Sequence, residues 1–326
     1  MHIRAWRIAH QGGPEVMRYE TVDLPAPKVG QVLVRHTAVG VNFIDIYHRS
    51  GLYPLPLPSG LGVEAAGTVE QIGDGVTGLA RGDRVAYAGG PIGAYAEAAL
   101  VPAARLVRVP DTVTDPDAAA SLLKGLTACY LLHRTFRVQR GHTVLVSAAA
   151  GGVGMILCQW ASHLGATVIG CVSSGEKAQL AHANGCTHTI DYRTEDVARR
   201  VREITAGEGV QVAYDSVGKD TFASTLDSLA PLGMFVSFGN ASGPAPDVSP
   251  AVLQNKGSLF FTRPSLAHYT ARREDLDTMA RDLFAAIARG IVKVHVNQTY
   301  PLHEADRAHR DLAARATTGS TVLMLG

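Results

Sequence analysis

The hydrophobic positions in the second half of the chain form short, nearly continuous apolar runs, separated by stretches with helical spacing. Such runs are typical of strands that are buried on both faces of a parallel sheet. One of the helical stretches extends from about Gly152 to Leu164. The alternation predicts an α/β unit over residues 126–262, a doubly wound parallel sheet of about six strands with the apolar cores HTVLVSAA, ATVIGCV, HTIDY, VQVAYDSV, GMFVSFG and SLFFT.

The first part of the chain follows a different pattern. Up to about Val107, short strand-like runs at 31–38, 65–72, 84–87 and 94–100 are interrupted by Gly and Pro, which predicts an irregular β-rich domain with few helices. After residue 263 a helical segment, Arg272 to Arg289, precedes a strand-like run, a second helix and the run STVLMLG. We expect this tail to return to the first domain, which would then comprise residues 1–125 and 263–326.

Composition and charge exclude several classes of protein. The 326 residues include 30 Lys and Arg against 29 Asp and Glu, a net charge of +1, with 46% hydrophobic and 18% charged residues. This composition is typical of a folded protein with a large core and excludes a disordered chain. A net charge this small gives no positive electrostatic field that would attract nucleic acid. Among nucleic-acid functions, only weak RNA binding by a local patch therefore stays open. The N-terminus lacks an apolar export signal and no segment resembles a membrane span, so we expect a cytoplasmic protein.

Cysteine spacing indicates neither disulfides nor a structural metal site. A disulfide framework is typical of small secreted chains that are dense in cysteine, and a zinc knuckle requires closely spaced cysteine pairs. This chain has no Cys-x-x-Cys pair and no cysteine in its first 128 residues. We interpret the four thiols as buried side chains, namely Cys129, Cys158, Cys171 and Cys186.

A glycine-rich turn follows the first strand of the predicted parallel sheet. The segment Ala149 to Gly154 reads AxGxxG where a dinucleotide-binding turn reads GxGxxG. Gly151 would let the backbone approach a pyrophosphate, and Gly154 would let the following helix pack closely on the sheet. The N–H groups at the helix N-terminus would bind the phosphates. Ala149 in place of the first glycine weakens the match, but the position between strand and helix supports dinucleotide binding.

The end of the second strand indicates which dinucleotide is bound. NAD-binding chains place an acidic residue there for the ribose hydroxyls. This chain has Ser173 and Ser174, followed by Lys177 one helical turn later, and these groups could bind and neutralise a 2′-phosphate. NADPH is therefore favoured, although Glu176 argues against it. In an alternative interpretation Ser173 only caps the following helix and Lys177 is solvated.

Taken together, these features resemble the medium-chain dehydrogenase/reductase superfamily, which pairs a β-rich GroES-like catalytic domain with a Rossmann domain. In its zinc alcohol dehydrogenases a Cys-x-x-Asp and a Gly-His-Glu segment supply zinc ligands. The corresponding segments here begin with Asn42 and contain Val63, neither of which can bind zinc. The resemblance therefore implies an enzyme without zinc.

Further motifs resemble the zinc-independent, ζ-crystallin-like quinone oxidoreductases across the whole chain. The motifs are Gln11 to Val16, Val41 to Pro54, AAAGGVG, Tyr214 to Gly218, Val236 to Gly243 and Phe261 to Leu266. The resemblance implies NADPH-dependent reduction of a small quinone. It also implies cofactor contacts by Asn42, Ile44, Asp45, Thr127, Gly151, Gly152, Val153, Gly154, Ser173, Lys177, Tyr192, Ser216, Phe238, Gly239, Phe261, Thr262, Arg263 and Arg315.

Reduction of a quinone without a metal needs a donor for the charge that appears on the acceptor oxygen. Candidates are the Asn42 amide and the hydroxyls of Tyr47 and Tyr53, with a proton from tyrosine or water. Tyr53, in a Pro-rich loop, is the favoured substrate contact, although it could equally be a loop-packing residue. Tyr47 lies at helical spacing from Phe43 and could be a core residue.

Two other functions stay open. The same motifs fit a reductase of α,β-unsaturated carbonyls or enoyl thioesters, because fold and cofactor do not decide the substrate. An RNA-binding or structural role, as for crystallins, is a more remote alternative that the net charge disfavours. We also expect a homodimer through the edge of the Rossmann sheet around residues 258–262, because an apolar edge strand needs to be covered.

Overall fold

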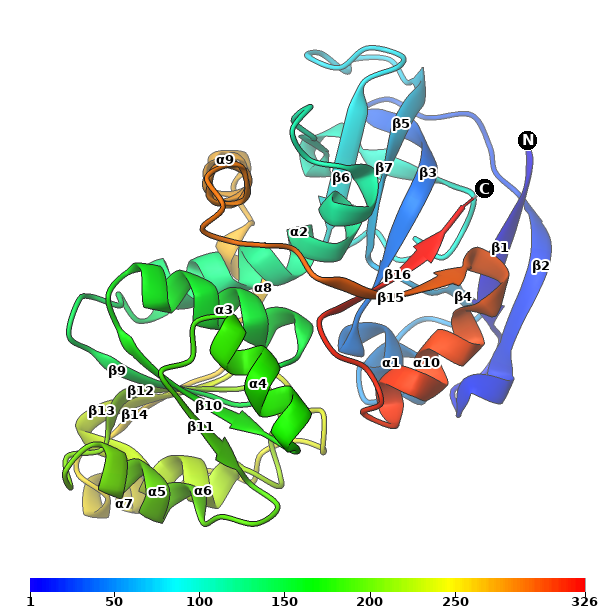
Figure 1. Ribbon diagram of the computed structural model, residues 1–326. Coiled ribbons are helices and arrows are strands. Elements are labelled where there is room, and N and C mark those ends of the chain that lie inside the picture. Colours follow the sequence, from blue (N-terminus) through cyan, green and yellow to red (C-terminus); the bar gives the residue numbers. More distant parts are fainter. Residues whose placement is uncertain (326) are drawn as a thin grey trace. The chain divides into compact units, whose positions relative to one another are not determined.

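The computed structural model describes residues 1–325, which divide into two compact units (Figure 1). The first unit comprises residues 1–126, 270–288 and 294 onward, and the second comprises residues 127–269 and 289–293. Within the described residues no helix is long and apolar enough to cross a membrane.

The second unit is built on a six-stranded parallel sheet with the strand order β11-β10-β9-β12-β13-β14. This confirms the predicted doubly wound sheet. The strands are β9 (Thr143–Val146), β10 (Thr167–Val172), β11 (His188–Asp191), β12 (Val210–Asp215), β13 (Leu229–Ser237) and β14 (Phe260–Thr262). The chain first builds outward from β9 to β11 and then continues on the other side of β9 with β12. In such sheets ligands bind where the strand order reverses, outside the carboxyl ends of the strands.

Helices connect these strands, as the parallel arrangement requires. The helix α3 runs from Gly152 to His163, close to the predicted stretch, and its buried face includes Ile156, Leu157 and Trp160. The remaining helices of this unit are α4 (Gly175–Ala183), α5 (Val197–Ile204), α6 (Phe222–Asp227), α7 (Pro250–Asn255) and α8 (Leu266–Tyr269).

The first unit contains a seven-stranded sheet and a three-stranded sheet. The larger one has the order β15-β16-β3-β5-β6-β8, with β7 also paired to β3; the smaller one has the order β2-β1-β4. The C-terminal strand β16 pairs antiparallel with β3, from Thr321 opposite Val41 to Met324 opposite Ala38. The strands are β1 (His2–Ile8), β2 (Met17–Asp23), β3 (Gln31–Val41), β4 (Ser59–Gly60), β5 (Glu64–Ile72), β6 (Arg84–Ala88), β7 (Ala98–Pro102), β8 (Val107–Arg108), β15 (Val296–Pro301) and β16 (Ser320–Met324).

Helices in this part of the chain differ from the prediction. The helix α1 (Phe43–Ser50) and the helix α2 (Asp115–Tyr130), which continues into the second unit, were not predicted, whereas α9 (Arg273–Ala288) and α10 (Ala305–Ala313) lie in the predicted helical segments. Apolar residues surround α2 on nearly all sides, so its pattern lacks the polar face that marks an amphipathic helix.

The predicted strand at residues 94–100 is partly wrong, because β7 begins only at Ala98. The preceding residues bridge β1 of the small sheet and the loop after β4 instead of joining one regular ladder. The N–H of Tyr95 donates to the Leu61 carbonyl (2.9 Å), and its own carbonyl accepts the Trp6 N–H (2.8 Å). An apolar run alone does not distinguish such a bridge from a strand.

His36 is a buried polar residue in the middle of β3. Its Nδ1 donates to the Ala96 carbonyl at 2.7 Å, which leaves Nε2 as the acceptor for the Tyr87 hydroxyl at 3.1 Å. Burial lowers the pKa of His36 to about 4. A proton on Nε2 would break the bond to Tyr87, so the folded state holds this imidazole neutral.

We predict that this histidine makes the fold sensitive to acid. Because the folded pKa lies below the ordinary value of 6.5, the unfolded chain binds the extra proton first, and stability is lost as the pH falls from 6.5 to 4. Between pH 7 and 4 the free energy of unfolding of the wild type should fall on the order of 3 kcal/mol more than that of His36→Gln, measured by urea unfolding. His2→Gln, at an exposed histidine, is the control. Equal losses in all three proteins would contradict the prediction.

Candidate functional site

The predicted site residues fall into two groups, one in each unit. In the second unit the glycine turn joins β9 to α3. The N–H groups of Gly152, Val153 and Gly154 precede the first hydrogen bond of the helix, which Met155 donates to Gly151 (2.9 Å). A Cβ on Gly154 would lie 2.3 Å from the Ala148 carbonyl oxygen, so glycine is required for this close packing. Unpaired N–H groups at a helix N-terminus suit an anion such as a pyrophosphate.

The turn accommodates Ala149, the residue that departs from the usual first glycine. The Ala149 side chain is fully buried, and its N–H donates to the Cys171 carbonyl of β10 (3.0 Å). A Cβ on the neighbouring Gly170 would lie 2.7 Å from the Ala149 Cβ. The space for the alanine methyl group is thus provided by a glycine on the adjacent strand. The departure from the motif is compensated by packing.

Residues at the carboxyl ends of β10 and β11 come together, as NADPH binding would require. The Tyr192 N–H donates to the Val172 carbonyl (3.1 Å), which brings Tyr192 beside the end of β10, next to Ser173. Ser173 and Lys177 are half-buried. The interpretation of Ser173 as the helix cap is wrong, because Ser174 is the cap and accepts the Lys177 N–H (3.3 Å). Ser173 follows the last residue of β10 and does not serve as that cap.

The loop after β12 is organised by Asp215, a residue that the sequence analysis did not select. The Asp215 carboxylate is fully buried. It accepts the N–H groups of Val217 (2.7 Å) and Gly218 (3.2 Å) and the hydroxyls of Ser147 (3.3 Å) and Thr221 (2.6 Å). A carboxylate with several donors is stabilised in a buried place. Its signal in the sequence is an acidic residue that directly ends an apolar strand.

Ser216, Phe238 and Gly239 lie together at the ends of β12 and β13. The Ser216 N–H donates to the Ser147 hydroxyl (2.8 Å), and the Phe238 N–H donates to the Asp215 carbonyl (2.7 Å). A Cβ on Gly239 would lie 2.4 Å from the Ser216 carbonyl oxygen. The two loops therefore contact each other at the edge of the sheet where ligands of this fold bind.

The residues of β14 differ in what their side chains do. The Phe261 ring packs on Phe235 in the core, with 5.1 Å between ring centroids. Thr262 is half-buried. The exposed Arg263 reaches back to β13 and donates to the Ser237 carbonyl at 2.8 Å.

Two further predicted cofactor residues lie elsewhere: Thr127 is buried in α2 of this unit, and Arg315 is exposed in the first unit, after α10.

In the first unit the predicted residues lie at the start of α1. The buried Asn42 precedes the helix, and its N–H donates to Asp45 (2.8 Å). Asp45 also accepts the Tyr95 hydroxyl at 2.9 Å. His309 contacts that hydroxyl through Nε2 (2.9 Å), while its Nδ1 lies 3.2 Å from Arg49. Arginine can only donate, so His309 accepts at Nδ1 and carries its proton on Nε2. Burial raises the pKa of Asp45 to about 7.

The two tyrosines proposed as substrate contacts lie against each other. Tyr47 is buried, and its ring stands edge-on to Tyr53, with 5.1 Å between centroids. The Tyr53 ring also lies near the buried His48 (6.1 Å between centroids). Tyr53 is half-buried, as is Ile44 on α1. Of the two tyrosines, Tyr53 is the more accessible.

A buried ion pair lies beside Asn42 and was missed by the sequence analysis. Glu64, the first residue of β5, is fully buried, and its Oε2 accepts the Asn42 side-chain amide (2.8 Å). Its Oε1 accepts the Leu123 N–H (2.6 Å). The ammonium group of Lys124 lies 3.5 Å from Oε2. Burial raises the pKa of Glu64, and the Lys124 charge opposes that shift. The available signal was a lysine within a run of mostly small and apolar residues.

The residues at these positions do not fit a catalytic zinc ion. The Asn42 amide nitrogen faces Glu64, and Val63 is an apolar side chain that is 2% exposed. Neither group supplies the thiolate or imidazole that zinc prefers. Across residues 1–325 no three His, Cys, Asp or Glu side chains are grouped so as to hold a metal ion.

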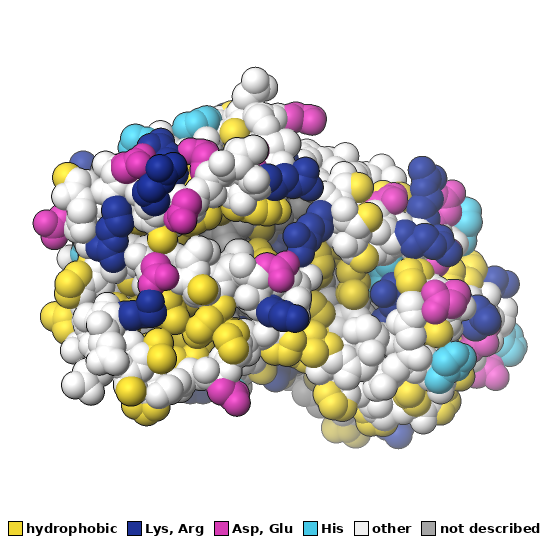
Figure 2. All heavy atoms as spheres, turned by 90° about the horizontal axis from the view of Figure 1, so that it is seen from below, with side chains coloured by type: hydrophobic (Ala, Val, Ile, Leu, Met, Phe, Trp, Pro, Cys, Tyr) yellow, Lys and Arg dark blue, Asp and Glu magenta, His cyan; other side chains and the backbone are white. Residues whose placement is uncertain are grey.

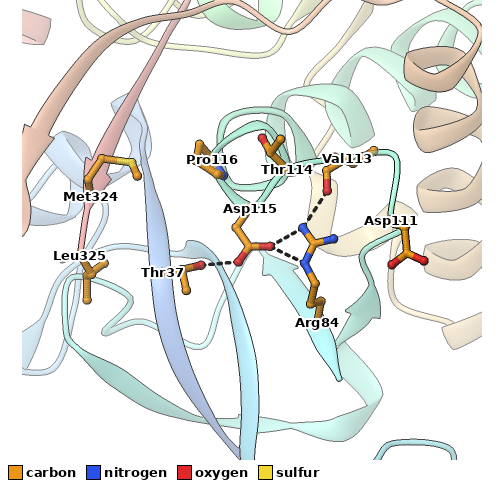
Figure 3. Close-up of a pocket in the computed structure, with 9 residues that line it drawn as sticks. All are labelled: Thr37, Arg84, Asp111, Val113, Thr114, Asp115, Pro116, Met324 and Leu325. Atoms are coloured by element: carbon orange, nitrogen blue, oxygen red, sulfur yellow. Dashed lines mark hydrogen bonds and ion pairs between the residues drawn. The ribbon is translucent and has the colours of Figure 1, made fainter. Parts of the chain in front are cut away.

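A pocket of about 430 Å³ lies elsewhere in the first unit (Figure 3). At its centre the Asp115 carboxylate accepts hydrogen bonds from Arg84 Nε (2.9 Å) and from the Thr37 hydroxyl (2.7 Å). The Arg84, Asp115 and Thr37 side chains are thus bonded to one another, and none of the predicted site residues lines the pocket.

Comparisons with known proteins agree with this geometry. Residues 28–111 match the alcohol dehydrogenase GroES-like domain, and residues 152–285 match the zinc-binding dehydrogenase family. The chain is 53% identical to a quinone oxidoreductase of Pseudomonas aeruginosa, over 98% of both chains. It is 48% identical to a 2-haloacrylate reductase of a Burkholderia species, over 97% of both chains. It also resembles the structure of Escherichia coli quinone oxidoreductase complexed with NADPH, with 46% identity, a TM-score of 0.97 and coverage of 99% of this chain and 100% of the other.

We predict that Gly170 is required by the alanine in the glycine turn. In Gly170→Ala the new methyl group would lie 2.7 Å from the Ala149 Cβ and 2.6 Å from the Cys186 sulfur. Overpacking of this kind should lower the free energy of unfolding by about 1–3 kcal/mol in urea unfolding. Ala149→Gly in the same chain removes one of the two clashes and should recover part of the loss.

Gly175→Ala is the matched control, because a Cβ there meets no atom within 4 Å. If Gly170→Ala were as stable as Gly175→Ala, the packing argument would be wrong.

Proposed function

The chain belongs to the quinone oxidoreductase family of the medium-chain dehydrogenase/reductase superfamily, and we propose that it catalyses NADPH-dependent reduction of quinones without a catalytic zinc ion. The observation that carries the proposal is similarity to quinone oxidoreductases over nearly the whole chain, including one whose structure contains NADPH. The donor set at Asn42 and Val63 supports the zinc-independent form.

The proposed cofactor site lies in the second unit at the glycine turn and at the carboxyl ends of the parallel strands. We assign the pyrophosphate to the N–H groups of Gly152, Val153 and Gly154. We assign the 2′-phosphate to Ser173 at the end of β10, to Tyr192 at the end of β11 and to Lys177 in the first turn of α4. We assign Gly151 to the pyrophosphate as well, and Thr127 to the pyrophosphate and the nicotinamide ribose. The nicotinamide end is assigned to Asn42, Ile44, Asp45, Phe238, Gly239, Phe261, Thr262 and Arg263, and further cofactor contacts to Ser216 and Arg315.

When bound, NADPH supplies a hydride from its nicotinamide ring. A quinone that accepts the hydride gains a negative charge on oxygen, and a proton from water or tyrosine completes the hydroquinone. The Asn42 amide is suited to stabilise that oxygen, because only one of its two N–H groups is bound by Glu64. We assign the substrate contact to Tyr53 rather than to the more buried Tyr47.

A second candidate function is reduction of an activated carbon–carbon double bond. The similarity to a 2-haloacrylate reductase favours it specifically. Hydride transfer to such an acceptor also places negative charge on an oxygen of the conjugated carbonyl or carboxylate group. The Asn42 side-chain amide would stabilise that charge in the same way as for a quinone. Enones and enoyl thioesters belong to the same chemical class.

The experiment that tests the function is a titration of NADPH and NADH into the purified protein, followed by 1,4-benzoquinone and then by a small enone. We expect tight binding of NADPH and quinone-dependent oxidation. Failure to oxidise NADPH with any small quinone would overturn the quinone proposal, and a kcat/KM for the enone well above that for quinones would favour the second candidate.

Lys177→Ala should weaken NADPH binding about tenfold and leave NADH binding unchanged, because it removes one charge-assisted contact.

Lys256→Ala is the control, because Lys256 pairs with Asp227 on the surface of the same unit. Equal weakening of NADPH binding in both variants would contradict the role of Lys177.

We also propose that two copies of the chain associate through β14. This strand ends the parallel sheet, so one side of it has unpaired backbone groups. Phe260 on it is 56% exposed, and Leu232, whose N–H donates to the Gly257 carbonyl (2.8 Å), is 67% exposed. Figure 2 shows apolar side chains at the surface of this unit, on the left, and interspersed basic and acidic side chains over the same face.

Light scattering at micromolar concentration should therefore give the mass of a dimer. Phe260→Lys places a charge on the proposed contact and should shift the population to monomer by at least tenfold in Kd. Val29→Lys, at another exposed apolar residue (76% exposed), should leave the dimer intact. A monomeric wild type would refute the proposal.

A further inference from the structure

Lys124 is a buried ammonium group with too few partners. The residue is 5% exposed, and its nearest ionic contact is Glu64 Oε2 at 3.5 Å. Among residues 1–325 its Nζ has no hydrogen-bond acceptor, although an ammonium group has three N–H donors. Lysine is rarely buried unless it is paired, because the loss of hydration is costly. A purely structural ion pair would use more of these donors.

Glu64 determines how the Asn42 amide is oriented. A carboxylate can only accept hydrogen bonds, so the Asn42 nitrogen must face it, and the observed distance is 2.8 Å. This arrangement leaves the second N–H of Asn42 for another acceptor. It also places a negative charge beside the amide, and that charge would repel a substrate oxygen that becomes negative there. The Lys124 ammonium lies against the same carboxylate oxygen.

We propose that Lys124 is the fixed cation of the substrate site: it neutralises Glu64, so that Glu64 can orient the Asn42 amide toward an acceptor oxygen without repelling the charge that forms on it. The inference rests on the proposed function and deepens it. Lys124 and Glu64 act here as positioning residues, while Asn42 would touch the substrate.

The first test compares Lys124→Met with the double variant Glu64→Gln/Lys124→Met. Lys124→Met leaves an uncompensated carboxylate, and kcat for quinone reduction should fall about 10- to 100-fold, with a smaller change in KM. The loss should be larger for acceptors whose reduced form is more basic. The double variant removes the repelling charge as well, so its kcat should return toward that of the wild type. Structural damage would not be repaired by a second substitution.

The second test measures the electrostatic effect of Lys124 on a bound ligand, without catalytic turnover. The probe is 4-nitrophenol, whose phenolate absorbs visible light, bound to protein that is saturated with NADP⁺. Relative to the wild type, Lys124→Met should lower the ratio of bound phenolate to phenol at least tenfold, and the double variant should restore it. If Lys124→Met fails to fold, Glu64→Gln alone provides the test, because an ammonium without its counter-ion should raise the ratio at least tenfold.

The matched control is Arg84→Met, which breaks another ion pair of the same unit and leaves Asp115 without its cation (Figure 3). It should lower stability and leave both kcat and the phenolate ratio within twofold of the wild type. The inference is overturned if Lys124→Met has the same kcat and the same phenolate ratio as the wild type. If Lys124→Met does not fold, the inference is overturned when Glu64→Gln has the phenolate ratio of the wild type. If the wild type itself reduces neither quinones nor enones with NADPH, the proposed function fails, and the inference fails with it.

Discussion

The arrangement of the first unit depends on one buried carboxylate, that of Glu64. It receives hydrogen bonds from the N–H of Leu123 on α2 and from the Asn42 amide at the start of α1, and it lies against the Lys124 ammonium. Because the carboxylate belongs to β5 and its partners to the start of α1 and to α2, these contacts join the three elements. The elements also approach closely: a Cβ on Gly40 of β3 would lie 2.3 Å from Glu64 Oε2. Removal of any one partner would leave a buried polar group unsatisfied, which is the costly case.

Asp215 plays the corresponding part in the second unit. Its fully buried carboxylate binds N–H and hydroxyl groups of the loop that follows β12 and the hydroxyl of Ser147, at the end of β9. At the point where the strand order reverses, one carboxylate thus joins the ends of β9 and β12 by hydrogen bonds. In both units a buried acidic residue supports neighbouring residues proposed to bind cofactor or substrate.

Much of the second unit could be predicted from the chain, because strands buried on both faces form continuous apolar runs and Gly151 and Gly154 mark the turn between strand and helix. The helix α2 could not, since it is buried nearly all round and carries no polar face. Glu64 and Lys124 also escaped prediction. Their pairing joins residues 60 positions apart, and spacing along the chain does not reveal such long-range contacts. The sequence also did not decide which of two adjacent serines caps α4, because both have the same capping propensity, and the structure shows that it is Ser174.

We propose that NADPH supplies the reducing equivalents and that the protein stabilises the charge on the acceptor with its own side chains, without a metal ion. The most direct measurement is the rate of benzoquinone-dependent NADPH oxidation after exhaustive chelation, with the zinc content of the same sample measured by mass spectrometry. The account predicts an unchanged kcat in protein that contains far less than one zinc ion per chain. Loss of activity on chelation, with recovery when zinc is added back, would contradict it.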